Sequence, residues 1–146
     1  MEHEREALSI AKIIKDTTKK VNSYYPEEQY LIYVKKYSDI EKFPVVSTAI
    51  PQPDTFIASV NDPNFSVYQN AGSVEDYIKS AKEDGLTHLV TDGKNALPKI
   101  LNDVFYNEKN YRYLVKQFDS KEDGFKYHIN VYKIDYEIFD AMSERN

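Results

Sequence analysis

Apolar side chains recur every three to four positions over residues 4–21, and lysines occupy many of the positions between them. This spacing is typical of an amphipathic helix that packs one apolar stripe against a core. Residues 73–84 show the same period and carry signals at both ends. The Ser73 hydroxyl can cap the first turn, and Gly85 can adopt the left-handed conformation that closes a helix. Two amphipathic helices are therefore expected.

A third helix is expected to follow Asn95, which can cap it, with Pro98 in the first turn. Its apolar face would consist of Leu97, Ile100, Leu101, Val104 and Phe105. A short terminal helix is expected from Tyr136 to Met142.

Four runs of β-branched and aromatic residues predict strands. Residues 29–34 form a continuous apolar run typical of a buried central strand, and residues 86–90 are expected to return as a second parallel strand. Residues 113–118 and 127–134 are expected to pair as an antiparallel hairpin through the loop at 121–125. In the last strand, alternation places Tyr127, Ile129, Val131 and Lys133 on one face and His128, Asn130, Tyr132 and Ile134 on the other.

Residues 37–72 carry four prolines and only weak strand signals, at 45–47 and 55–60. A loop-rich insert of this length is commonly functional, so the segment is a candidate contact surface. Taken together, the elements predict one α/β domain over residues 1–146. We expect a Rossmann-like arrangement in two or three layers, with a mixed sheet that ends in an antiparallel hairpin.

The composition excludes several classes of function. The chain has 146 residues, a formal net charge of −5 and no cysteine. Its lysines are scattered among acidic residues, so nucleic acid is not an expected partner, and neither disulfides nor thiolate metal sites can form. The sequence contains no apolar run long enough to span a bilayer and no export signal, so the chain is expected to be soluble and monomeric when isolated. Its abrupt helical start fits a fragment of a longer protein.

One loop is a candidate ligand site. Asp92, Gly93, Lys94 and Asn95 leave a predicted strand and enter a predicted helix, where open α/β sheets usually receive ligands. Asp92, Lys94 and Asn95 could there bind a small anion, such as a phosphate or carboxylate, with the amides of the helix N-terminus. Ordinary turn chemistry accounts for the same residues without a ligand.

His88 and His128 lie on predicted strands and could meet with Asp92 in a metal site or a hydrolase centre. The alternative is that both histidines are ordinary strand residues, because no third ligand follows a recognised spacing. No nucleophile motif or cofactor-binding motif is present, so we expect no catalytic residue, metal or cofactor in this chain. The thirteen tyrosines could stack sugar or base rings, or simply pack in the core.

The pattern of the chain also resembles a family. Residues 85–93, 101–108, 113–120 and 127–136, together with the opening helix at 4–14, are similar to the C-terminal tail of certain archaeal polytopic glycosyltransferases. These belong to the class of dolichyl-phosphate-mannose protein mannosyltransferases and aminoarabinose transferases.

The resemblance implies an accessory domain on the extracytoplasmic face, attached to the transmembrane portion of a parent glycosyltransferase. Such a domain would help to position an acceptor or a lipid-linked sugar donor. The catalytic acidic residues of that class lie among the membrane helices, so none is carried over to this chain. The alternative is a free-standing cytosolic α/β protein that binds a small anionic ligand at residues 92–95.

Overall fold

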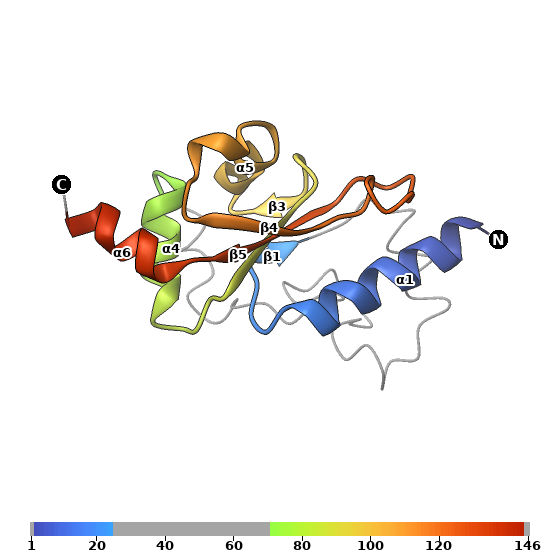
Figure 1. The fold of residues 1–146 in the computed structure, drawn as a ribbon, viewed down its shortest axis with the longest axis horizontal. Helices are drawn as coiled ribbons and strands as arrows, with labels where there is room; N and C mark the ends of the chain where they lie inside the picture. The colour runs from blue at the N-terminus through green and yellow to red at the C-terminus, as the bar shows by residue number, and fades with distance from the viewer. Residues whose placement is uncertain (1, 25–70, 145–146) are drawn as a thin grey trace.

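The computed structural model describes residues 2–24 and 71–144 of the chain. The predicted strand at 29–34 and nearly all of the 37–72 insert lie outside these residues. The described elements are α1 (Glu2–Thr17), β1 (Ser23–Tyr24), α4 (Val74–Lys82), β2 (His88–Thr91), β3 (Ala96–Leu97), η1 (Lys99–Leu101), α5 (Asn102–Tyr106), η2 (Glu108–Asn110), β4 (Leu114–Asp119), β5 (Asn130–Ile134) and α6 (Tyr136–Glu144) (Figure 1).

The main sheet has three strands in the order β2-β5-β4, and both of its pairings are antiparallel. The predicted hairpin is confirmed, since β4 and β5 pair across the 120–129 connection. The expected strand at 86–90 is present as β2, which runs antiparallel to β5, and its expected parallel neighbour at 29–34 lies outside the described residues. A parallel contact of β2 in the described chain is the bridge between Val21 and His88. The α/β class is therefore correct, and the described sheet is antiparallel.

A β-bulge in β4 explains why its sequence alternates imperfectly. Lys116 lies opposite Tyr132, and Phe118 lies opposite the next residue, Val131, so Gln117 is an extra residue. The insertion moves Phe118 onto the same face of the sheet as Val131. Without it, the Phe118 ring would point to the other face.

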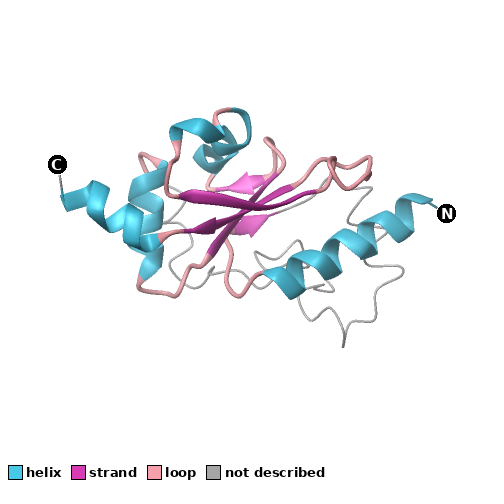
Figure 2. Ribbon diagram, viewed as in Figure 1, coloured by secondary structure: helices cyan, strands magenta, loops and turns pink. Residues whose placement is uncertain are grey.

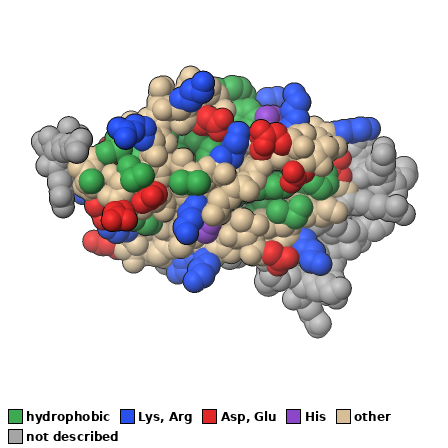
Figure 3. Space-filling model, in the orientation of Figure 1, with side chains coloured by type: hydrophobic (Ala, Val, Ile, Leu, Met, Phe, Trp, Pro, Cys, Tyr) green, Lys and Arg blue, Asp and Glu red, His purple; other side chains and the backbone are tan. Residues whose placement is uncertain are grey.

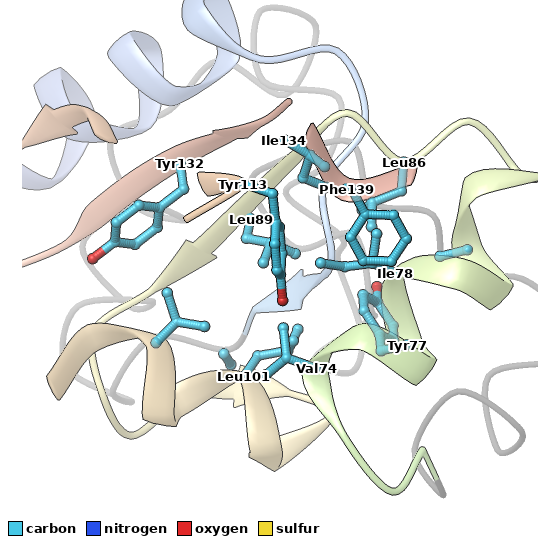
Figure 4. Packing of buried hydrophobic residues seen from close by; sticks show 13 residues of the cluster. Val74, Tyr77, Ile78, Leu86, Leu89, Leu101, Tyr113, Tyr132, Ile134 and Phe139 are labelled. Carbon is cyan, nitrogen blue, oxygen red and sulfur yellow. The ribbon is translucent and has the colours of Figure 1, made fainter. Parts of the chain in front are cut away.

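Apolar residues cover both faces of the sheet, and successive strand residues point to opposite sides. Val90 and Val131 pack with α1 on one face, whereas Leu89 and Tyr132 pack with α4, α5 and α6 on the other. Figure 2 shows the strands crossing between these helices. On the second face, the Tyr113 ring meets Phe139 edge to face, with centroids 5.0 Å apart, among strand and helix residues (Figure 4).

The ends of α4 are those that the sequence predicts. The Ser73 hydroxyl accepts the Asp76 N–H at 3.0 Å. At the other end the Gly85 N–H donates to Lys82 and the Leu86 N–H donates to Ala81. Together with the Gly85 φ of +92°, these two bonds form a Schellman motif, which satisfies the last carbonyls of the helix.

The outer edge of β2 is covered by the segment that follows α1. The Lys20 carbonyl accepts the N–H groups of Thr87 and His88. The Asn22 side chain then imitates a strand, because its amide donates to the Val90 carbonyl at 3.0 Å and its oxygen accepts the Val90 N–H at 2.7 Å. This pairing explains why α1 ends at Thr17 rather than at the predicted residue 21.

Candidate functional site

The Asp92 loop, residues 92–95, follows β2 and is held together by one carboxylate. Asp92 Oδ1 accepts the N–H groups of Lys94 and Asn95, both at 2.8 Å. Its Oδ2 accepts the Tyr24 hydroxyl at 2.9 Å and the Asn95 side-chain amide at 2.7 Å. A carboxylate offers about four acceptor positions, and all are occupied here. Asp92 thus closes its own loop and ties it to β1.

The structure brings Asp92, Lys94 and Asn95 together, but in different roles from those expected. The backbone N–H groups of Lys94 and Asn95 both donate to Asp92. Lys94 is exposed, and Asn95 caps no helix, because its side chain also donates to Asp92. The prediction of a helix directly after Asn95 is wrong. Residues Ala96–Leu97 form β3, which pairs with β1, and η1 begins only at Lys99.

The reason for this late start lies in the Asn102 side chain, the polar anchor of the segment. Its oxygen accepts the Ala96 N–H and the Thr91 hydroxyl, both at 3.0 Å. Its amide donates to the carbonyls of Ala96 and Lys99. These contacts stabilise residues 96–99 in a non-helical path, so local helix signals do not decide the conformation.

His88 and His128 do not meet. His88 lies opposite Lys133 on the α1 face, whereas His128 precedes β5 and lies against the Phe105 ring of α5 and the Asp119 carboxylate. His88 is buried between the Thr87 hydroxyl, 2.6 Å from Nδ1, and the Gln117 side chain, 3.2 Å from Nε2. The hypothesis of a metal or hydrolase centre built from His88, His128 and Asp92 is therefore wrong.

The pKa of His88 is lowered mainly by burial, which disfavours the imidazolium. The Gln117 hydrogen bond opposes this effect, and the nearby charge of Lys133 adds to it. His88 thus behaves as a neutral structural residue. Within the described ranges, no group of three or more histidine and carboxylate side chains could hold a metal ion.

A second polar constellation lies on the α5 face, and we name it the His128 cluster. Its members are Glu108, Lys116, Asp119, His128, Asn130 and Tyr132. Lys116 bridges Glu108 and Asp119 at 3.2 and 3.3 Å, and His128 Nε2 lies 3.0 Å from Asp119 Oδ1. The Tyr132 hydroxyl donates to Glu108 at 2.8 Å.

Charge and hydrogen bonding fix the protonation of the central carboxylate. Burial acts to raise the pKa of Asp119, but the Glu122 N–H, Lys116 and His128 together hold it below its ordinary value. The pKa of Lys116 is raised by Glu108 and Asp119, against the effect of burial. Ion pairs therefore join β4 to η2, and the Tyr132 hydroxyl of β5 binds to the same Glu108 carboxylate.

The His128 cluster contains an acid–base pair but no activated nucleophile. The hydroxyl of Ser120, the residue directly after β4, is fully buried, donates to the Tyr127 carbonyl and accepts the Ile129 N–H. A nucleophile would need its base within hydrogen-bond reach and a free path to substrate. Among the described residues, the buried Asn130 Oδ1 has no hydrogen-bond partner, and His128 Nε2 lies 3.0 Å from Asp119 Oδ1 without the geometry of a hydrogen bond.

Tyr106 was one of several tyrosines expected to stack rings or to pack in the core, and the sequence did not single it out; it is the most exposed large apolar side chain of the described residues. The ring is 64% exposed, yet it is held in place. A Cβ added at Gly93 would lie 2.7–2.8 Å from three atoms of the Tyr106 ring and hydroxyl, so the ring passes directly over this glycine. Gly93 has a φ of +87°, and Phe105 meets the ring edge to face at 5.1 Å. A glycine at this position is the signal that could have suggested a close approach.

Two polar groups of α5 accompany this ring. Asp103, three residues before Tyr106 in α5, and Asn107, the residue directly after α5, are both exposed. The Asp103 carboxylate accepts the Asn107 amide at 2.7 Å and the Tyr111 hydroxyl at 2.5 Å. The carboxylate is thereby held in place but keeps acceptor positions facing solvent.

Comparisons with protein-family models, with curated proteins and with solved structures gave no match. Across residues 2–24 and 71–144, no helix combines the length and the apolar character needed to cross a bilayer. On the face shown in Figure 3, acidic and basic side chains of the described residues are interleaved rather than sorted into patches.

Proposed function

We propose that this chain is a non-catalytic accessory domain of a membrane-embedded glycosyltransferase that uses a lipid-linked sugar donor. It would lie on the extracytoplasmic face, attached to the transmembrane portion of its parent, and help to position acceptor or donor. The support for the parent enzyme is the resemblance of the sequence described above. The non-catalytic role is supported by Asp92, whose carboxylate accepts hydrogen bonds from its own loop and from Tyr24.

A catalytic group must be able to reach and react with a substrate. A general acid or base has to exchange protons with a substrate, and a ligating carboxylate has to offer lone pairs. The Asp92 carboxylate accepts four internal hydrogen bonds, and His88 is buried between Thr87 and Gln117. Recruiting either residue for catalysis would break contacts that hold β2 to its surroundings.

The alternative, a cytosolic protein that binds a small anion at the Asp92 loop, receives less support from the geometry. The N–H groups of Lys94 and Asn95 would have to leave the Asp92 carboxylate in order to reach an anion. The carboxylate would also repel that anion at short range. Lys94 alone remains as an exposed positive group on the loop.

The finer architecture is also part of this proposal. A Rossmann-like layering would need further strands, and the predicted strand at 29–34 is the candidate to supply one. The 37–72 segment and the exposed surface of the Asp92 loop are the contact surfaces that we propose for the parent protein.

The proposal is tested by reading the genomic DNA upstream of Met1 and then by truncation. We expect the reading frame to continue upstream into apolar segments of about 20 residues, the length of a spanning helix. Removing residues 1–146 from that protein should raise the KM for acceptor or donor more than it lowers kcat. A stop codon and ribosome-binding site directly before Met1, or a truncated enzyme with unchanged KM, would overturn it.

A further inference from the structure

The exposed side of α5 carries an aromatic ring that is fixed in place although it faces solvent. Exposed side chains usually rotate freely and lose entropy when they bind a ligand. Tyr106 is 64% exposed, but it is seated on the Gly93 backbone and flanked by Phe105. A ring held in this way loses little freedom when a ligand stacks on its open face.

The polar groups beside the ring are fixed as well. Asn107 and Tyr111 both donate to the Asp103 carboxylate, at 2.7 and 2.5 Å. Two of about four acceptor positions on that carboxylate are used, so two remain. The side-chain amide of Asn107 still has its oxygen and one N–H with which to bind a ligand. The surface therefore offers a flat apolar ring next to acceptors and a donor of fixed direction.

We propose that Tyr106, Asp103 and Asn107 form a contact site for a neutral pyranose ring. A pyranose presents a face of C–H groups, which suits the negative π-face of tyrosine, and a rim of hydroxyls, which suits a carboxylate and an amide. Nucleotides and sugar phosphates fit less well, because Asp103 repels their charge. This inference rests on the proposed function, since it names the part of acceptor or donor that the domain would touch.

The test is a titration of ¹⁵N-labelled chain with methyl glycosides of mannose, glucose and N-acetylglucosamine, followed by ¹H–¹⁵N spectra. We expect millimolar binding of at least one glycoside, with the largest shifts at Gly93 and residues 103–107. Tyr106→Ala should weaken this binding about tenfold, the loss of one stacking contact, whereas Tyr106→Phe should stay within about twofold. Asp103→Asn should weaken the same glycoside while leaving the Tyr106 signals in place.

Ile138→Ala on α6 is the matched control, because Ile138 is also an exposed large apolar side chain. It should bind the glycoside as the original chain does. The inference is overturned if no glycoside binds, if Tyr106→Ala binds unchanged, or if choline or AMP shifts these residues at lower concentration than every glycoside. Its failure is distinct from that of the proposed function, which depends on the KM of the truncated parent enzyme and not on this surface.

Discussion

Replacing Asp92 by alanine should destabilise the fold strongly. The carboxylate accepts four hydrogen bonds, which come from Tyr24, Lys94 and Asn95. A hydrogen bond to a charged group contributes about 1.5–3 kcal/mol, but water can replace part of this in a half-buried loop, and bonds to one group are not additive. We therefore expect the free energy of unfolding to fall by about 2–4 kcal/mol.

Asp92→Asn should give an intermediate result. Its single carbonyl oxygen can still accept the two backbone N–H groups, as in an ordinary Asx turn. Its amide, however, places donors against the Asn95 amide and the Tyr24 hydroxyl, so about 1 kcal/mol should be lost. Asp123→Ala is the matched control, because Asp123 is exposed in the hairpin connection, and its change should stay within about 0.5 kcal/mol.

The assay is urea unfolding of the three variants and the original chain, followed by circular dichroism at pH 7. The expected order of midpoints is the original chain and Asp123→Ala, then Asp92→Asn, then Asp92→Ala. If Asp92→Ala unfolds at the same urea concentration as Asp123→Ala, the carboxylate does not hold the loop. Its oxygen atoms and the loop amides would then be available to a ligand.

Three further changes test other parts of the structure. The pKa of His88 is lower in the folded state than in the unfolded state, so neutral His88 stabilises the fold above about pH 6.5 and this stabilisation is lost as the pH falls. Between pH 7 and pH 5, the free energy of unfolding should therefore decrease less in His88→Gln than in the original chain. The pKa of Asp119 is also lowered in the folded state, so ionised Asp119 stabilises the fold and this stabilisation is lost as the pH falls below about 4. In thermal melts, Asp119→Asn should therefore show a smaller decrease of Tm below pH 4 than the original chain. An unchanged decrease of Tm would refute the pairing of Asp119 with Lys116 and His128. In urea unfolding, Gly85→Ala should lower the free energy of unfolding by about 1–2 kcal/mol, because Gly85 has a positive φ. Gly72→Ala should lower it less, because Gly72 is not among the glycines with positive φ. Equal losses would contradict the Schellman motif at the end of α4.

The elements that the sequence predicted correctly carry their signals locally. Ser73 and Gly85 bound α4 because both end contacts form within the helix or one turn beyond it. The hairpin of β4 and β5 follows from alternation and a polar connection of ten residues, 120–129. The register of that hairpin also places Asp119 opposite Asn130, so the proximity of Asp119 and His128 could have been predicted from it.

The features that the sequence did not predict depend on contacts between distant segments. Apolar runs such as β2 look the same whether their neighbours are parallel or antiparallel, and its edge is covered by Asn22, 68 residues earlier than Val90. The helix expected after Asn95 is replaced by β3 because Asn102 binds back to Ala96 and Thr91. No local pattern contains this information.

The candidate site also depends on contacts between segments that are distant in the sequence. Its position after β2 could be predicted from the Asp-Gly turn, but the role of Asp92 depends on Tyr24, which reaches it from β1. The exposed Tyr106 was one of thirteen tyrosines in the sequence, and only its packing over Gly93 distinguishes it from the buried ones.

The central claim is that this chain contacts a sugar without transforming it. The most direct measurement mixes the labelled chain with a short-chain polyprenyl-phosphate sugar and an acceptor, and follows donor ³¹P and protein ¹H–¹⁵N signals together over several hours. We predict that the neutral pyranose of the acceptor shifts the signals of Gly93 and residues 103–107 while the donor signal stays constant. Consumption of donor at a rate proportional to the protein concentration, and lost in His128→Ala, would contradict the account.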